Sequence, residues 1–152
     1  CLTKIKWGIW YILITDKTVK INKILMKNTN NILIKGFHCA NLILIIFYLY
    51  PGSVLGYVLY SDTSIQPQIT QNFLISSNHF YAFIVLSIIG ILSYRNTRKI
   101  NFLINYLFLL SIVLEFFHIY IPNRSFEVRD LFGNIMGVVV VFVSYRIKQK
   151  YE

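Results

Sequence analysis

Four long apolar stretches, separated by shorter polar ones, dominate the pattern of hydrophobic and polar positions along this chain. Each is close to the roughly 20 residues that an α-helix needs to cross the apolar core of a membrane. None alternates between apolar and polar residues at every second position, as the strands of a membrane β-barrel do. The pattern therefore predicts an all-α fold, a four-helix transmembrane bundle with helices at about residues 31–50, 78–94, 100–120 and 128–145.

Residues at the ends of these stretches support the boundaries. Pro51 directly follows the first stretch, and proline disfavours a helical conformation in the residue before it. The tyrosines near the ends of the stretches are interpreted either as an interfacial aromatic belt or as ordinary packing residues. They are Tyr48, Tyr50, Tyr94, Tyr120 and Tyr145.

The composition excludes the usual soluble classes. Hydrophobic residues make up 56% of the 152 residues and charged residues 14%, with a mean hydropathy of +0.58. A soluble domain carries about 25% charged residues. Intrinsic disorder requires low hydrophobicity, and two cysteines are too few for a disulfide scaffold. We therefore expect an integral membrane protein whose first partner is the lipid bilayer.

The positive charge, a net +9, is distributed unevenly along the chain. Seven Lys residues precede Phe37, three Lys or Arg residues lie in the segment 95–99, and three lie in 146–150. Thirteen of the fifteen would then lie on one side of a bundle with four crossings. Because cytoplasmic segments retain positive charge, we expect both termini in the cytoplasm and the loops 51–77 and 121–127 outside. The charge is interpreted as a topology signal, and no nucleic-acid partner is expected.

This topology divides the chain into a basic N-terminal segment, a transmembrane domain and a basic cytoplasmic tail, at residues 1–30, 31–147 and 148–152. Three interpretations of residues 1–25 stay open. They are an upstream stretch that is not translated in the native protein, an interfacial basic segment, or a segment whose Cys1 is a lipidated N-terminus. We expect the first, with Met26 as the initiating residue, because the apolar run Trp7–Ile14 is too short to span.

Ionisable and amide side chains gather near the outer ends of the predicted helices. Glu115 and His118 lie three positions apart, and Asp130 and Asn134 lie four apart, so each pair shares one helix face. Ionisable groups are costly inside a membrane and are therefore functional candidates. The sequence predicts one outer pocket that brings together six residues: His79, Glu115, His118, Arg124, Asp130 and Asn134.

Two interpretations of this pocket stay open. In one, Arg124 forms a buried ion-pair network with the carboxylates of Glu115 and Asp130, which fixes the outer hairpin. In the other, the pocket binds or acts on a ligand, with Glu115 and Asp130 as the catalytic candidates. The histidines and carboxylates are acceptable metal ligands, but their spacing matches no diagnostic metal motif. No metal and no cofactor are therefore expected.

Gly133 and Gly137 lie beside Asn134 in the sequence GNIMG. Two small residues four positions apart allow another helix to approach closely. This surface permits a homo-oligomer that associates through Gly133 and Gly137, but does not require one.

A longer motif brings in a known family. Glu115 and His118 form E-x-x-H, followed by P-x-R-S-F-E-x-x-D-x-x-x-N-x-x-G, and H-F-x-A-F begins at His79. On these motifs, residues 37–147 resemble the VanZ-like family of small bacterial membrane proteins. The family commonly has Gln where this chain has His118. The matching residues are His79, Phe80, Ala82, Phe83, Glu115, His118, Pro122, Arg124, Ser125, Phe126, Glu127, Asp130, Asn134 and Gly137.

The resemblance implies a protein of the bacterial cell envelope, embedded in the cytoplasmic membrane, and it supplies no reaction. The first functional hypothesis is a pocket that faces outward and binds lipid or cell-wall intermediates. The alternative is a membrane-embedded enzyme in which Glu115 or Asp130 acts as the acid or base and Arg124 holds an anionic group. Replacement of Glu115 by Gln separates the two, because it keeps the shape of the side chain and removes the base.

The predicted topology can be tested with single cysteines in a background that lacks the native ones. A cysteine at Ser64 should react with a membrane-impermeant maleimide in intact spheroplasts, because the loop 51–77 is expected outside. A cysteine at Gln149 should stay unlabelled until the membrane is opened. Equal labelling at both positions would contradict the topology.

Overall fold

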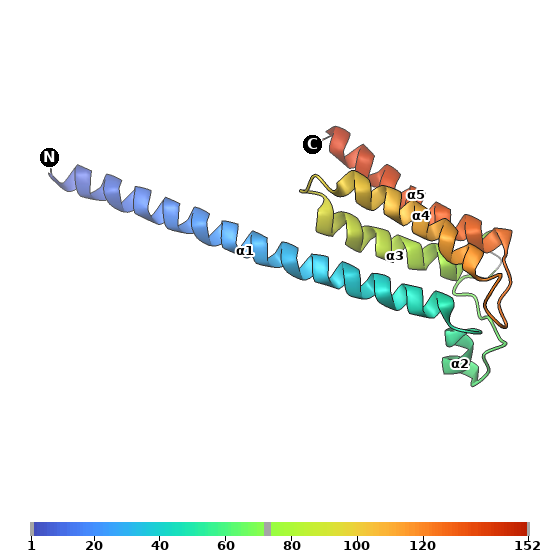
Figure 1. The fold of residues 1–152 in the computed structure, drawn as a ribbon. Coiled ribbons are helices and arrows are strands. Elements are labelled where there is room, and N and C mark those ends of the chain that lie inside the picture. Colours follow the sequence, from blue (N-terminus) through green and yellow to red (C-terminus); the bar gives the residue numbers. More distant parts are fainter. Residues whose placement is uncertain (1, 72–73, 152) are drawn as a thin grey trace.

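The computed structural model describes residues 2–71 and 74–151, with side chains described for 18–22, 24–71 and 74–151. The described residues form helices and irregular segments and include no strand. The all-α prediction is thereby confirmed. Five helices follow one another along this part of the chain (Figure 1): α1 (Leu2–Leu49), α2 (Val54–Tyr60), α3 (Ser77–Tyr94), α4 (Ile100–Phe117) and α5 (Val128–Tyr151).

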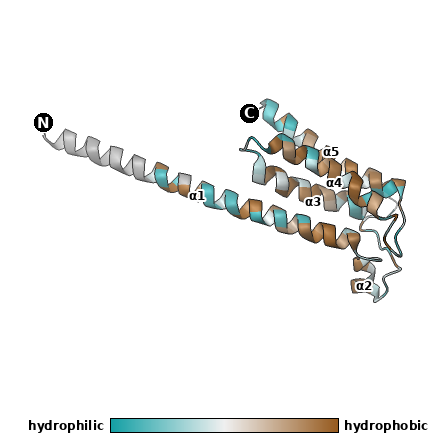
Figure 2. Ribbon diagram, in the orientation of Figure 1, coloured by the Kyte–Doolittle hydropathy of each residue, from teal (hydrophilic) through white to brown (hydrophobic). Residues whose placement is uncertain are grey.

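Four of these helices are long and apolar enough to cross a membrane, judged by length and composition. They are α3, α4, α5 and the Thr18–Leu49 part of α1. Large apolar side chains such as Val85, Leu109 and Phe132 are more than half exposed on the outside of the bundle. Figure 2 shows that apolar residues dominate the middle of α3, α4 and α5 and the C-terminal end of α1. A surface of this kind matches lipid tails, and the fold is that of a multi-pass membrane protein.

The observed helix ends differ from the predicted ones mainly in α1 and α5. The first helix was expected from residue 31, but it begins at Leu2 and runs for 48 residues without interruption. At 1.5 Å per residue it is about 70 Å long, and its N-terminal half extends beyond the bundle (Figure 1). No proline precedes Pro51 to break the helix. Helix α5 likewise continues to Tyr151, so the predicted tail at 148–152 begins inside a helix.

A short helix, α2, lies in the segment that was predicted as a plain outer loop. It begins after Ser53, whose side chain accepts a hydrogen bond from the Gly56 amide at 3.0 Å, a standard N-terminal cap. A side chain at Gly56 would overlap the carbonyl oxygens of Asp62 and Ile65. Glycine therefore lets the segment after α2 fold back tightly against it, beside the end of α1.

The bundle is arranged around α3, which packs against α5, α1 and α4. Helix α4 in turn packs against α5. The buried apolar side chains between the helices form one core: Phe37, Leu44, Tyr48, Phe83, Leu86, Leu103, Leu107, Leu110, Leu114 and Val138. Because α1 and α5 both pack on α3, their polar residues at the α2 end of the bundle are brought to the same place.

The GNIMG surface packs inside the chain. A Cβ atom on Gly137 would lie 2.6 Å from the Phe80 carbonyl oxygen, and one on Gly133 would lie 2.8 Å from that of Ser76. Both glycines are buried, and they let α5 approach the backbone of α3 and of the residue before it. The close approach that was expected to serve a second copy is therefore made within the chain. A homo-oligomer, which stays a prediction, would have to use another surface.

This close approach predicts opposite effects of alanine at two glycines. Gly137→Ala should lower the melting temperature of the purified protein, because overpacking costs about 1–3 kcal/mol. Gly36→Ala is the control, since no neighbouring atom lies within 4 Å of a Cβ there. It should leave the melting temperature unchanged or raise it, because alanine is the better helix former by about 1 kcal/mol. Equal melting temperatures for the two variants would show that α3 and α5 are not packed this closely.

Candidate functional site

Side chains from four helices meet where α1 and α4 end and α3 and α5 begin. We call this group the polar cluster and define it as Tyr48, His79, Glu115, His118, Asp130 and Asn134. Its members are buried or nearly so, and His79 and Asp130 each keep 11% of the side chain exposed. Five of the six residues predicted for the outer pocket belong to it. The sixth, Arg124, lies at the edge of the cluster and makes no ion pair with it.

His79 lies between the two carboxylates. Its Nε2 atom is 3.2 Å from Oδ2 of Asp130, and its Nδ1 atom is 3.8 Å from Oε2 of Glu115. His79 stands near the start of α3, while Asp130 lies in the first turn of α5. An acidic residue there also meets the positive end of the helix dipole. One imidazole ring thus connects α3, α4 and α5.

Glu115 is completely buried, and its two oxygens differ in their surroundings. Oε1 accepts a hydrogen bond from the Glu127 amide at 3.0 Å and lies 3.3 Å from Nδ1 of His118. Oε2 has no hydrogen-bond partner among the described residues. A buried carboxylate oxygen without a donor is costly, so this atom marks a place that the surrounding side chains do not satisfy.

Asn134 connects the cluster to the rest of the bundle. Its side-chain NH₂ group donates to the Ser111 carbonyl oxygen at 3.1 Å, and its Oδ1 accepts from the Tyr48 hydroxyl at 2.6 Å. Nδ1 of His79 lies 3.0 Å from the same hydroxyl and 3.2 Å from Asn134 Oδ1. These hydrogen bonds form one buried network that joins α1, α3, α4 and α5.

Tyr48 is the cluster residue whose role the sequence did not reveal. Its position at the end of an apolar stretch fits an interfacial aromatic belt, but it is 8% exposed and faces the core. Its ring stacks on that of His118, with centroids 5.7 Å apart and planes at 16°. One feature of the sequence could have indicated this role. Tyr48 and His79 flank the same predicted outer loop, so both are expected at the same depth in the membrane.

The interpretation in which Arg124 forms ion pairs with Glu115 and Asp130 is contradicted, because the described residues show no such pair. Among the described residues, the side chains that pair with both carboxylates are histidines, and Arg124 makes a long bond of 3.5 Å from its Nε to the Tyr50 carbonyl oxygen. Partial burial lowers the pKa of Arg124, an effect opposed by the charges of Asp130 and Glu115. The turn after α4 holds Arg124 at the edge of the cluster, where its guanidinium is accessible.

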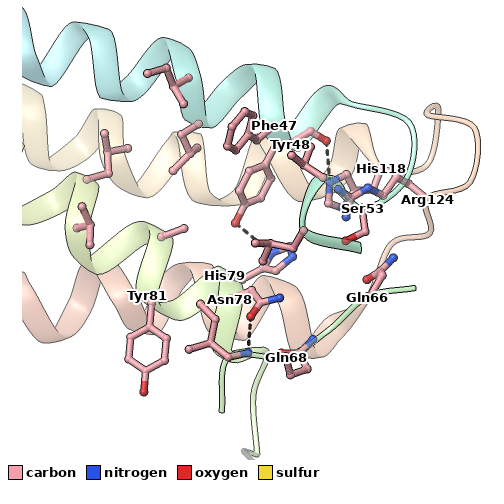
Figure 3. A pocket seen from close by; sticks show the side chains of 18 of the residues that line it. Phe47, Tyr48, Ser53, Gln66, Gln68, Asn78, His79, Tyr81, His118 and Arg124 are labelled. Atoms are coloured by element: carbon pink, nitrogen blue, oxygen red, sulfur yellow. Dashed lines mark hydrogen bonds between the residues drawn. The ribbon is translucent and has the colours of Figure 1, made fainter. Parts of the chain in front are cut away.

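A pocket of about 570 Å³ opens beside the cluster, between α1, α2 and α3. One part of its wall is apolar and is formed by α1 and α3, with Ile43, Leu44, Phe47, Val85 and Leu86. The other part is polar, and Figure 3 shows its labelled side chains gathered near the loops: Ser53, Gln66, Gln68, His79, His118 and Arg124. The pocket therefore has an apolar part along the helices and a polar part at the bundle end.

The structure also bears on the expectation that no metal is bound. One ligand atom from each of His79, Glu115 and Asp130 lies within 4.8 Å of the other two. The three residues come from three different helices, and so no short sequence spacing could reveal the group. These are ligand types that zinc accepts.

The hydrogen bonds of Asn134 predict strong coupling between α1 and α5. Asn134→Leu would remove the acceptor of the Tyr48 hydroxyl proton and a donor to the Ser111 carbonyl oxygen, and an unsatisfied buried polar group costs roughly 1–3 kcal/mol. We therefore expect a marked fall in melting temperature. The loss should be much smaller when Tyr48→Phe is already present, which is the non-additivity that a double-mutant cycle measures.

Asn105→Leu, on an exposed position of α4, is the matched control and should change the melting temperature little. If Tyr48→Phe and Asn134→Leu lower the stability independently and their effects add, the two side chains are not hydrogen-bonded in the folded protein.

No family model matches this chain, and neither a curated protein nor a solved structure matches it. The resemblance to the VanZ-like family therefore stays a prediction that rests on the motif residues themselves. The function has to be inferred from the geometry of the polar cluster and the pocket.

Proposed function

We propose that this chain is a VanZ-like protein of the bacterial cytoplasmic membrane that binds an amphiphilic ligand, a lipid or a lipid-linked cell-wall intermediate, on the outer side. The observation that carries the proposal is the division of one pocket into an apolar and a polar part. An amphiphile has the same division, with apolar chains joined to a polar headgroup.

The apolar part of the pocket matches an acyl or isoprenoid chain. Ile43 and Phe47 on α1 face Val85 on α3 across it, and about half of the surface of each of the three side chains is exposed. The wall follows the helices at a depth where they would be surrounded by lipid tails. A chain can therefore enter sideways from the bilayer without crossing a polar barrier, and its burial is favourable in proportion to the apolar area covered.

The polar part of the pocket matches an anionic headgroup. Arg124 is the one Lys or Arg side chain among the described residues that line the pocket. Its guanidinium presents several donors in a plane and binds phosphate or carboxylate in a bidentate manner. Ser53, Gln66 and Gln68 add neutral polar groups on the loop side. A phosphate-bearing lipid is the ligand class that this combination favours.

The distribution of basic residues supports an outward-facing pocket. Two basic segments lie at the opposite end of the bundle from α2 (Figure 1). One is the connection between α3 and α4, with Arg95, Arg98 and Lys99, and the other is the end of α5, with Lys148 and Lys150. Because positive segments stay in the cytoplasm, the α2 end would face outward. Both chain termini would then be cytoplasmic.

The second candidate, an enzyme, is favoured by one contact. His79 lines the pocket and also touches both Glu115 and Asp130, so it connects the two carboxylates to a ligand. Glu115 or Asp130 would then act as acid or base through His79, with Arg124 as the anion clamp. Loss of the cellular phenotype in a Glu115→Gln variant that still binds lipid would support the enzyme, and a retained phenotype would exclude it.

The lipid proposal can be tested by native mass spectrometry of the purified protein with phosphatidylglycerol, undecaprenyl phosphate and phosphatidylcholine. Arg124→Gln should weaken binding of the two anionic lipids about 10-fold or more, because a hydrogen bond to a charged group contributes about 1.5–3 kcal/mol. Val85→Trp should weaken all three lipids by filling the apolar part of the pocket.

Two matched variants control for charge and bulk. Arg98→Gln removes the same charge at the other end of the bundle, and Leu109→Trp adds the same bulk on the exposed face of α4. Neither should change the binding. Equal lipid retention by the wild type, Arg124→Gln and Val85→Trp would overturn the proposal.

A further inference from the structure

We infer that the polar cluster binds a divalent transition-metal ion, Zn²⁺ by its ligand types, held by His79, Glu115 and Asp130. This goes beyond the proposed lipid binding and does not depend on it. The inference follows from the directions of the hydrogen bonds in the cluster and from the unpartnered oxygen of Glu115.

The first step fixes the proton on His79. The Ser111 carbonyl oxygen can only accept, so it must face the NH₂ group of Asn134, at 3.1 Å. Oδ1 of Asn134 therefore points to Tyr48, whose hydroxyl donates its one proton to it at 2.6 Å. Nδ1 of His79, 3.0 Å from that hydroxyl oxygen, must then be the donor of their hydrogen bond.

The second step concerns the other nitrogen of the ring. When Nδ1 of a neutral imidazole carries the proton, Nε2 presents a lone pair. Here Nε2 lies 3.2 Å from Oδ2 of Asp130, which is also an acceptor. Two acceptors come this close when a proton or a cation lies between them. Ligand atoms about 2.0–2.2 Å from a tetrahedral Zn²⁺ are roughly 3.3–3.5 Å apart, which this separation resembles.

The same arrangement is found at His118. Its Nε2 lies 3.2 Å from the Tyr48 carbonyl oxygen, an acceptor, so Nε2 carries the proton. In a neutral ring Nδ1 then presents a lone pair, 3.3 Å from Oε1 of Glu115. The two carboxylates thus face two lone pairs.

Glu115 supports the metal site independently of the proton positions on the histidines. Its side chain is completely buried, and its Oε2 has no hydrogen-bond partner among the described residues. That oxygen lies 3.8 Å from Nδ1 of His79, the nitrogen that carries the proton, which is too far for a hydrogen bond. One ligand atom from each of His79, Glu115 and Asp130 lies within 4.8 Å of the other two. A small movement of the side chains would place all three around one ion. A metal would satisfy the oxygen that the protein leaves without a donor.

The residues around the three ligands hold them in place, as the residues around a protein metal site usually do. Metal-binding histidines usually donate their second ring N–H to an acceptor that orients the ring, and ligating carboxylates are themselves hydrogen-bonded. Tyr48 and Asn134 are the acceptors that orient the ring of His79. The Glu127 amide donates the hydrogen bond that orients the Glu115 carboxylate. Three protein ligands leave a fourth position open, as in catalytic zinc sites. His79 also lines the pocket, so that position would be near the polar end of a bound ligand.

The test measures metal bound to the purified protein in detergent. After treatment with EDTA the protein is equilibrated with Zn²⁺, desalted and analysed by mass spectrometry of the metal. We expect about one Zn²⁺ per chain, as for a single three-ligand site. Co²⁺ should give the visible absorption bands of a tetrahedral ion. Glu115→Gln, Asp130→Asn and His79→Gln should each abolish the stoichiometric binding, and Tyr48→Phe should weaken it roughly 10–100-fold.

Matched variants show whether the metal is held by the polar cluster. Asp62→Asn alters an exposed outer carboxylate and His38→Gln alters a histidine bonded to Tyr94, so both should bind Zn²⁺ as the wild type does. Arg124→Gln, which tests the lipid proposal, should also keep the metal. Zn²⁺ should raise the melting temperature of the wild type and leave that of Asp130→Asn unchanged.

Helix content from circular dichroism shows that each variant is folded. A folded wild type that takes up no more Zn²⁺ or Co²⁺ than Glu115→Gln would overturn the inference, and protons rather than a metal would then lie between the histidines and the carboxylates. Binding that persists in all three ligand variants would overturn it as well, because the metal would be held elsewhere.

Discussion

The organisation of this end of the bundle depends on the hydrogen bond from the Tyr48 hydroxyl to Oδ1 of Asn134. Both side chains are buried, and in the interior an unmade hydrogen bond is costly and a made one is strong. The Ser111 carbonyl sets which way the Asn134 amide faces, and from that orientation we infer that the proton of His79 lies on Nδ1. One buried chain of donors and acceptors thus connects four helices and determines the chemistry of the ring between the two carboxylates.

Close helix packing makes this chain of bonds possible. Gly133 and Gly137 on α5 leave no side chain between α5 and the backbone around the start of α3. Asn134, which directly follows Gly133, is thereby carried into the bundle instead of facing lipid. The same approach brings Asp130, one helical turn earlier, to His79. The glycine pair is therefore part of the construction of the site, because the space that it leaves lets the polar cluster assemble.

Much of the fold could be predicted from hydrophobic pattern, and much of the site could not. The ends of α3 agree with the sequence because polar residues and basic turns bound it. The start of α1 was missed because no residue marks a break there, and α2 was missed because seven residues are too few for a periodic signal. Helix spacing placed Glu115 near His118 and Asp130 near Asn134. The partner of the carboxylates was predicted wrongly as Arg124, because the rotation of each helix about its axis depends on packing that the sequence does not display.

The proton positions on the two cluster histidines test this account most directly. Nitrogen-15 NMR of protein labelled at histidine reports whether each ring nitrogen carries a proton, and His38, which contacts Tyr94, serves as an internal reference. The account predicts a proton on Nδ1 of His79 and on Nε2 of His118, with both signals slow to exchange with water. A His79 ring whose Nδ1 lacks a proton would contradict it, because the hydrogen bonds through Tyr48 and Asn134 would then have to run in the opposite direction.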